Sequence, residues 1–156
     1  MVIMKIDLKH LFLAIIFLLS CSQNRVKDPN GNNNEWLKPE QFTPISFIDY
    51  FIIETNQSSN INIITMMDCF PDNWVKKSDL EALIPLIKST KKCNCFQNPI
   101  SSYIPSKVTA NVGGYAILFI NSYRKKEKIK LGLNACPQTD KISVEEIERW
   151  WLEQKK

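Results

Sequence analysis

The chain has 156 residues, of which 44% are hydrophobic and 23% are charged, and its formal net charge at pH 7 is +4. A chain of this length forms one domain of ordinary size. The small excess of positive charge gives no reason to expect a nucleic-acid partner.

The first predicted element is an apolar run over residues 11–20, in which only Ser20 is polar and which follows Lys5 and Lys9. A membrane-spanning helix needs about 20 apolar residues, so this run is too short to cross a bilayer and has the form of a signal-peptide core. An ordinary secretory cleavage site fits poorly, because it requires a small side chain where Leu18 stands.

Residues Leu18-Leu19-Ser20-Cys21 resemble the lipobox of bacterial lipoproteins. The resemblance implies that residues 1–20 are a lipoprotein signal peptide and that Cys21 is lipidated and becomes the new N-terminus. Two or three acyl chains hold a protein on a membrane without any transmembrane helix. Because Ser22 and not Asp follows the cysteine, we expect a lipid-anchored protein of the bacterial cell envelope, on the outer membrane. The alternatives are an uncleaved signal anchor, or a chance cysteine after an ordinary signal peptide.

Residues 22–35 contain one apolar side chain, Val26, and are dominated by Asn, Gly, Pro and charged residues. Such a segment cannot bury enough surface to offset the entropy of ordering it. We therefore expect residues 21–35 to be a lipidated N-terminus and flexible tether, which spans roughly 20 Å on average. The folded domain is expected over residues 36–156.

From Trp36 onward, apolar residues recur at helical spacing. Thr43-Pro44 predicts the start of a helix over 44–55, and the apolar run over 61–70 predicts a second, short helix that Pro71 ends. Ser78 and Glu81 have the form of a capping box, which predicts a third helix that Pro85 kinks or shortens. A long polar loop is expected to follow, from residue 91 to 106.

A fourth, long helix is predicted by apolar residues at spacings of three and four: Val108, Val112, Tyr115, Ala116, Phe119, Ile120 and Tyr123. Gly113 and Gly114 cost such a helix about 1 kcal/mol each, which favours close approach of a neighbouring helix. The alternative is a buried strand over residues 115–120. Ser143 and Glu146 form another capping box, which predicts a last helix with Val144 and Ile147 facing inward.

Together these elements predict an all-α single domain of about five helices, packed as a bundle or as HEAT-like helical hairpins. The stretches WVKKSDLEALIPLIKST, VGGYAILFINSYR and IERWW are similar to small bacterial lipoproteins with a helical domain. That resemblance covers roughly residues 60–152 and implies no functional residues.

The only histidine, His10, lies in the predicted signal peptide, so cleavage would leave the protein without one. This excludes Ser-His and Cys-His nucleophilic pairs and zinc sites that need imidazole. Ser89 to Lys92 has the S-x-x-K form of serine β-lactamases, but neither the S-D-N nor the K-T-G partner motif occurs. We expect no catalytic residues and no cofactor or metal.

Two groups of charged residues remain as candidates. Asp68 and Asp72 could act as an acid and a base, although a helix end and a turn explain them equally simply. A basic cluster contains Arg124, Lys125, Lys126, Lys128 and Lys130. We interpret it as a solvated helix end in preference to an anion-binding patch.

Four cysteines remain after lipidation: Cys69, Cys93, Cys95 and Cys136. In an exported protein an even number predicts disulfides, with three connectivities that the sequence does not separate. The alternative is a four-thiolate metal site, which the Cys-x-Cys spacing does not favour.

Trp74, Trp150 and Trp151 are candidate contacts for a partner, because two adjacent rings cannot both face one core. The simpler role is to cover a helix seam.

From these observations we expect a membrane-anchored helical interaction module that binds a protein partner, in one version as an immunity protein against a toxin. The alternatives are a carboxylate-dependent envelope hydrolase and a purely structural envelope protein.

Overall fold

The computed structural model describes residues 36–53, 61–104 and 108–155, and residues Trp36–Lys156 form one compact unit. The predicted signal peptide, Cys21 and the tether lie outside the described residues. No helix in the described part of the chain combines the length and the apolar character needed to span a bilayer.

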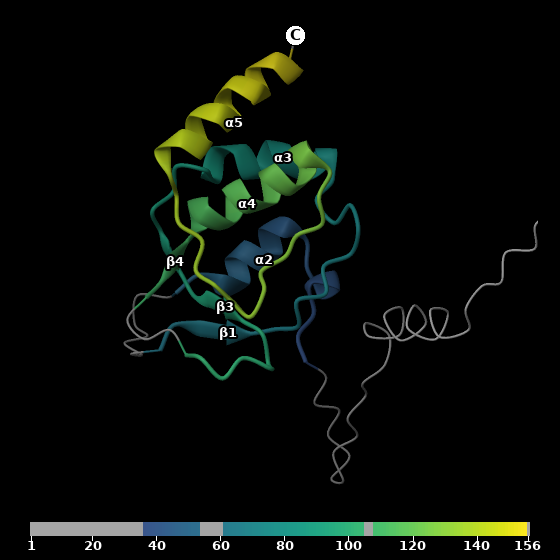
Figure 1. Ribbon diagram of the computed structural model, residues 1–156. Coiled ribbons are helices and arrows are strands. Elements are labelled where there is room, and N and C mark those ends of the chain that lie inside the picture. Colours follow the sequence, from purple (N-terminus) through teal and green to yellow (C-terminus); the bar gives the residue numbers. More distant parts are fainter. Residues whose placement is uncertain (1–35, 54–60, 105–107, 156) are drawn as a thin grey trace, which may run out of the picture. The chain divides into compact units, whose positions relative to one another are not determined.

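The domain is mixed α/β, so the all-α prediction is wrong. The described residues form four α-helices: α2 (Pro44–Phe51), α3 (Lys77–Leu83), α4 (Val112–Lys125) and α5 (Lys141–Gln154). Two 3-10 turns, η1 (Pro39–Gln41) and η2 (Ile84–Leu86), accompany them. Figure 1 shows the helices stacked above the strands, with α5 at the end of the domain farthest from β1.

Five short strands form two sheets within the described segments. The larger sheet has the order β1-β3-β5, from β1 (Ile63–Thr65), β3 (Cys95–Gln97) and β5 (Asn134–Ala135). Strand β1 is parallel to β3, with Ile64 opposite Phe96, and β5 is antiparallel to β3. The smaller sheet pairs β2 (Lys92–Cys93) with β4 (Ala110–Asn111) in antiparallel orientation.

Two predicted helices differ from the structure because backbone groups pair with distant strands. The segment predicted as a helix over 61–70 contains β1, whose β-branched residues pair with β3. The helix predicted over 44–55 begins at Pro44 as expected, but it ends at Phe51. Ile52 then bridges Cys93, and the Ile53 amide donates to the Lys92 carbonyl at 3.2 Å.

Helix starts are fixed by side chains that satisfy the first free amides. Thr43 and Ser46 cap α2 reciprocally: the Ser46 amide donates to Thr43 Oγ1 and the Thr43 amide donates to Ser46 Oγ. The capping boxes predicted to begin at Ser78 and at Ser143 are wrong, because both helices begin earlier in the sequence. Helix α3 begins at Lys77, where Asp79 accepts from the Lys76 amide, and α5 begins at Lys141, capped by Asp140.

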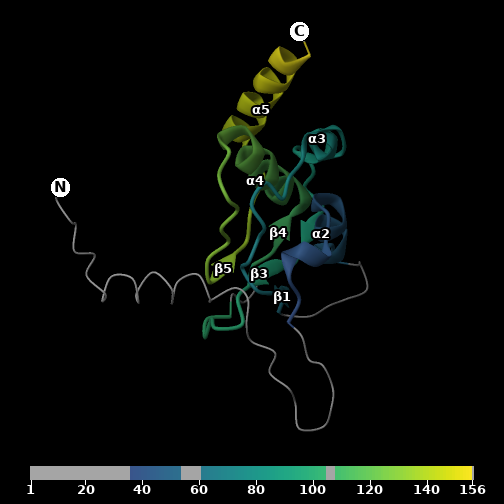
Figure 2. The same ribbon diagram turned by 90° about the vertical axis from the view of Figure 1, so that its right-hand side faces the viewer.

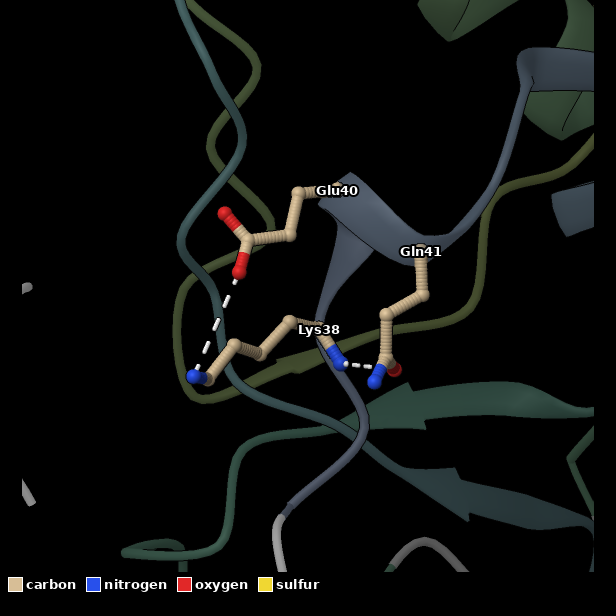
Figure 3. Close-up of polar contacts among 3 residues, drawn as sticks. All are labelled: Lys38, Glu40 and Gln41. Atoms are coloured by element: carbon tan, nitrogen blue, oxygen red, sulfur yellow. Dashed lines mark hydrogen bonds and ion pairs between the residues drawn. The ribbon is translucent and has the colours of Figure 1, made fainter. Parts of the chain in front are cut away.

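The described chain begins next to a small polar turn at η1. The Lys38 amide donates to Gln41 Oε1 at 3.0 Å, and Lys38 Nζ lies 4.0 Å from Glu40 Oε1, as Figure 3 shows. The Met67 amide donates to the Leu37 carbonyl at 2.9 Å. The first residues of the domain are therefore attached to the segment that follows β1.

An aromatic cluster forms the centre of the core. The Phe47 ring stacks on Phe51 with centroids 4.3 Å apart and meets Tyr115 and Phe119 edge to face. Tyr115 is fully buried, and its hydroxyl donates to the Asn94 carbonyl at 3.0 Å. Burial raises the pKa of Tyr115 well above its usual value, so the phenol stays neutral.

Helix α4 confirms the helical prediction for residues 115–120 and explains the glycine pair. A Cβ on Gly113 would lie 2.6 Å from the Ile87 carbonyl oxygen, and one on Gly114 would overlap the Pro137 backbone. Close approach is therefore the reason for both glycines. The neighbours are the segments after η2 and after β5, and not the helix that the sequence led us to expect.

Candidate functional site

An open groove of about 420 Å³ runs along one face of α4 and is the candidate site. One side consists of α4 residues at helical spacing, and the other side is the segment that follows the helix. The lining residues are Gly114, Ile117, Leu118, Asn121, Ser122, Lys125, Glu127, Lys128, Ile129 and Lys130.

The chain reverses at the end of α4 and returns beside it. Lys126 adopts the left-handed conformation, with φ of 54°, and its amide donates to the carbonyls of the last helical turn. The Glu127 amide then donates to the Ser122 carbonyl at 3.0 Å. This turn brings residues 127–132, the groove wall, alongside the helix.

The groove wall has alternating side chains that fix its orientation. Ile129 and Leu131 are buried, whereas Lys128 and Lys130 are exposed. A period of two is typical of an extended segment with one face on a core. The apolar side chains therefore attach the wall to the domain, and the lysines are left at the rim of the groove.

Asp68 and Asp72 both hold the groove wall. The Asp68 carboxylate accepts from the amides of Leu131, at 3.1 and 3.2 Å, and of Gly132, at 2.9 Å. Asp72 lies 3.5 Å from Lys128 Nζ. Each carboxylate therefore has a structural partner, and this arrangement gives no support to an acid–base pair between them.

The rim of the groove is positive and its floor is apolar. Three exposed lysines, Lys125, Lys128 and Lys130, outnumber Glu127 in the lining and Asp72, which pairs with Lys128. Ile117 is buried in the floor. Arg124 contributes differently: its guanidinium lies 5.3 Å from the Trp150 ring centroid. Within the basic cluster, Arg124 packs on α5, and Lys125, at the end of α4, joins Lys128 and Lys130 at the groove rim. Such a groove fits an extended anionic segment that carries an apolar side chain.

The cysteines divide into different environments. Cys95 and Cys136 form a disulfide with Cα atoms 4.5 Å apart, which continues the pairing of β3 with β5 by one residue. Bonded cysteines supply no thiolates, so the four-thiolate metal site is not supported. Cys93 is a buried free thiol whose pKa burial raises to about 11, and Cys69 is half-buried after β1.

The three tryptophans proposed as partner contacts, of the four in the chain, have packing partners. Trp74 donates through its indole nitrogen to the Pro39 and Phe42 carbonyls, both at 3.1 Å, and its ring meets core aromatic rings. Trp150 and Trp151 are half-buried on α5 and contact each other. The structure gives Trp74 a structural role and leaves parts of Trp150 and Trp151 accessible.

Other candidate chemistry is not assembled in the described part of the chain. Ser89 accepts through its carbonyl from the Gly113 amide and from Thr139 Oγ1, which makes its backbone a structural acceptor. Within residues 36–53, 61–104 and 108–155, no cluster of three or more His, Cys, Asp or Glu side chains could hold a metal ion.

Sequence reasoning missed the groove because its wall contains no regular element. The available signal was the alternation of Lys128, Ile129, Lys130 and Leu131, which indicates an extended, half-buried segment. That alternation is too short to show which helix it lies beside.

No protein-family model matches this chain, and no significant match was found among curated proteins or solved structures.

Proposed function

We propose that this protein is a lipid-anchored protein of the bacterial envelope, on the outer membrane, that binds a protein partner through the α4 groove. The observation that carries the anchoring is the lipobox-like Leu18-Leu19-Ser20-Cys21 at the end of a short apolar run. The groove, with its apolar floor and lysine rim, supports the binding role.

The anchor and the groove have different physical tasks. Each buried acyl methylene contributes about 0.8 kcal/mol, so two or three chains at Cys21 keep the protein on the membrane lastingly. The tether of residues 22–35 then allows the domain to reach a partner in the same envelope compartment.

The chemistry of the groove indicates the class of partner. Exposed lysines at a rim raise the association rate of an acidic segment more than they raise its affinity. Burial of half-buried Leu118 against an apolar side chain of the partner would supply most of the affinity. The partner is therefore an acidic, extended segment with at least one apolar anchor.

The anchoring is tested by mass spectrometry of the N-terminal peptide from protein purified from its original host. We expect the chain to begin at Cys21 and to carry acyl chains. A chain that begins at Met1, or a Cys21 recovered as a thiol or in a disulfide, contradicts the proposal.

The binding site is tested by photo-crosslinking in the native cells. A photoreactive amino acid at Leu118, in the groove, should give an adduct of defined mass, and the same group at Glu145, exposed on α5, should not. Lys125→Glu with Lys128→Glu should reduce the Leu118 adduct, because an acidic segment would then be repelled by the rim. Equal adducts at both positions, or none at Leu118, would show that the groove is not the binding site.

One specific version of this role is an immunity protein that blocks a toxin acting in the envelope. It predicts a toxin gene beside the gene for this protein, and it predicts that the Leu118 adduct contains the product of that gene. An adduct with an unrelated envelope protein excludes the immunity version while leaving the binding role in place.

A further inference from the structure

Four large apolar side chains are exposed together at the strand end of the domain. They are Ile100, Tyr103, Ile104 and Leu133, and we name them the strand-end patch. The Asn98 amide donates to the Leu133 carbonyl at 2.9 Å, and the Asn134 side chain meets Ser101 Oγ at 2.8 Å. Two segments distant in sequence thus present their apolar side chains on one surface.

The most exposed member, Ile100, is held outward by a well-bonded turn. The Ser101 amide donates to the Asn98 carbonyl at 2.9 Å across Pro99, and the Ile100 amide donates to Asn98 Oδ1 at 3.2 Å. Turns normally carry polar residues at such positions, yet Ile100 is 78% exposed. A fixed turn that displays isoleucine and tyrosine is typical of a surface that contacts an apolar medium.

The patch lies at the end of the domain where the predicted tether joins it. Figures 1 and 2 show the loop of residues 98–104 and the start of the described chain at the same end, opposite the C-terminus. Trp36, the first described residue, is also exposed. A tether of residues 22–35 that spans roughly 20 Å would keep this end close to the lipid to which Cys21 is attached.

The charge pattern suits an anionic bilayer. No Asp or Glu occurs between Glu81 and Glu127, and this stretch contains Lys91, Lys92 and Lys107. Anionic phospholipid would therefore not be repelled by the loop, and Tyr and Trp are the side chains enriched at the headgroup level.

We infer that the strand-end patch docks on the phospholipid surface, with Ile100 and Tyr103 in the headgroup region, so that α5 points away from the membrane. This inference rests on the proposed lipid anchor at Cys21. It adds a second membrane contact that sets the orientation of the domain, in addition to the anchor that sets its location.

The test uses the full, lipidated chain in vesicles of phosphatidylethanolamine and phosphatidylglycerol. An environment-sensitive fluorophore is attached to Ile100→Cys, or, as the matched control, to Ile142→Cys on α5, where the parent isoleucine is 72% exposed. The parent protein, which carries half-buried Cys69 and buried Cys93, is treated with the fluorophore in the same way, and its signal is the labelling background that is subtracted.

We expect the label at position 100 to shift its emission to shorter wavelength, and brominated lipids to quench it at least twofold. The label at position 142 should show neither effect. Adding Tyr103→Glu should reduce quenching at position 100, whereas adding Leu152→Glu, at an equally exposed site on α5, should not.

The other outcomes separate this inference from the anchor. Protein that sediments with the vesicles but is unquenched at both positions overturns the docking and leaves the anchor intact. Protein that does not sediment overturns the anchor and the docking with it. A wavelength shift at position 100 without quenching by brominated lipid indicates a protein contact at the patch, and also overturns the docking.

Discussion

The Asp68 side chain holds the groove wall through hydrogen bonds from two backbone amides. Asp68→Asn keeps the shape of the side chain but loses the charge, and its amide group would face the backbone amides of Leu131 and Gly132. Charge-assisted hydrogen bonds of this kind contribute about 1.5–3 kcal/mol. We expect the free energy of unfolding to fall by about 2 kcal/mol, measured by urea denaturation.

Asp72→Asn is the matched control for Asp68→Asn. Asp72 is largely exposed, and within the described segments its ion-pair partner is exposed Lys128, so its removal should change the free energy of unfolding by less than about 0.5 kcal/mol. If both variants lost the same biological effect without loss of stability, the two carboxylates would have a chemical role and our structural interpretation of them would be wrong.

Gly114 shows how a single missing side chain shapes the helix face. In Gly114→Ala the new methyl group would overlap the Pro137 and Gln138 backbone, so the segment after β5 must move. Overpacking of this kind costs about 1–3 kcal/mol, which exceeds the gain of about 1 kcal/mol in helix propensity. We expect urea denaturation to show net destabilisation.

Gly132→Ala is the comparison for Gly114→Ala. Nothing lies within 4 Å of a Cβ at Gly132, but the residue has φ of +69°, so the cost there is backbone strain alone, about 1 kcal/mol. A stabilised Gly114→Ala variant would show that the contact with Pro137 relaxes freely.

At the scale of elements, the sequence predicted helices better than strands. The spacing of Tyr115, Ala116 and Phe119 correctly indicated α4, because a long helix repeats its pattern several times. The strands have two or three residues each, too few for a pattern of period two. Ile63, Ile64 and Thr65 carried the only local signal, their β-branched side chains, and it was outweighed by the apolar run that continues to Phe70.

Helix α5 depends on a cap whose strength varies with pH. Asp140 accepts from the Ser143 amide at 2.8 Å, and this hydrogen bond, followed by one from the Ser143 side chain, lowers the pKa of Asp140 below its usual 3.8. Because the pKa of Asp140 is lower in the folded than in the unfolded protein, the ionised carboxylate stabilises the fold at pH values above the unfolded-state pKa. This stabilisation is lost as the pH falls through the folded-state pKa.

We therefore expect the stability difference between the parent and Asp140→Asn to shrink as the pH falls from about 5 to about 2. Urea denaturation of both proteins across this range measures the difference. A difference that stays constant with pH would mean that the charge of Asp140 contributes nothing and that only its hydrogen bond matters.

The Cys95–Cys136 disulfide links β3 to the end of β5 and closes a loop with a sequence separation of 41 residues. Loop-closure entropy for that length corresponds to about 4 kcal/mol. The double variant Cys95→Ala with Cys136→Ala should lose about that much free energy of unfolding, measured under non-reducing conditions. Cys93→Ala, at the buried free thiol, should lose only the packing of one small side chain, about 1 kcal/mol.

At the scale of the whole molecule, the sequence indicated the parts more reliably than their arrangement. Asp68, Asp72 and the basic cluster were all identified as charged candidates, but sequence does not show that the carboxylates hold the segment carrying the lysines. That arrangement depends on contacts between residues about 60 positions apart in the sequence, such as the hydrogen bond from the Leu131 amide to the Asp68 carboxylate. Local patterns do not encode contacts of this length, so neither the groove nor the strand-end patch was predictable.

The proposed anchor and the strand-end patch have different tasks at the membrane. If each of the four patch side chains gains about 1 kcal/mol in the headgroup region, the sum is about 4 kcal/mol, which corresponds to a dissociation constant of about 1 mM. That affinity is too weak to hold a free protein on a membrane, yet sufficient for a domain tethered within roughly 20 Å of it.

Accordingly, a mature chain with Cys21→Ser, which cannot be acylated, should remain in the supernatant when vesicles are sedimented at about 0.1 mM accessible lipid, with about a tenth of it bound. The acylated protein should sediment completely under the same conditions. Full sedimentation of the Cys21→Ser protein would mean that the domain binds membranes strongly by itself. The acyl chains would then be unnecessary for location, and the patch would hold the protein on the bilayer as well as orient it.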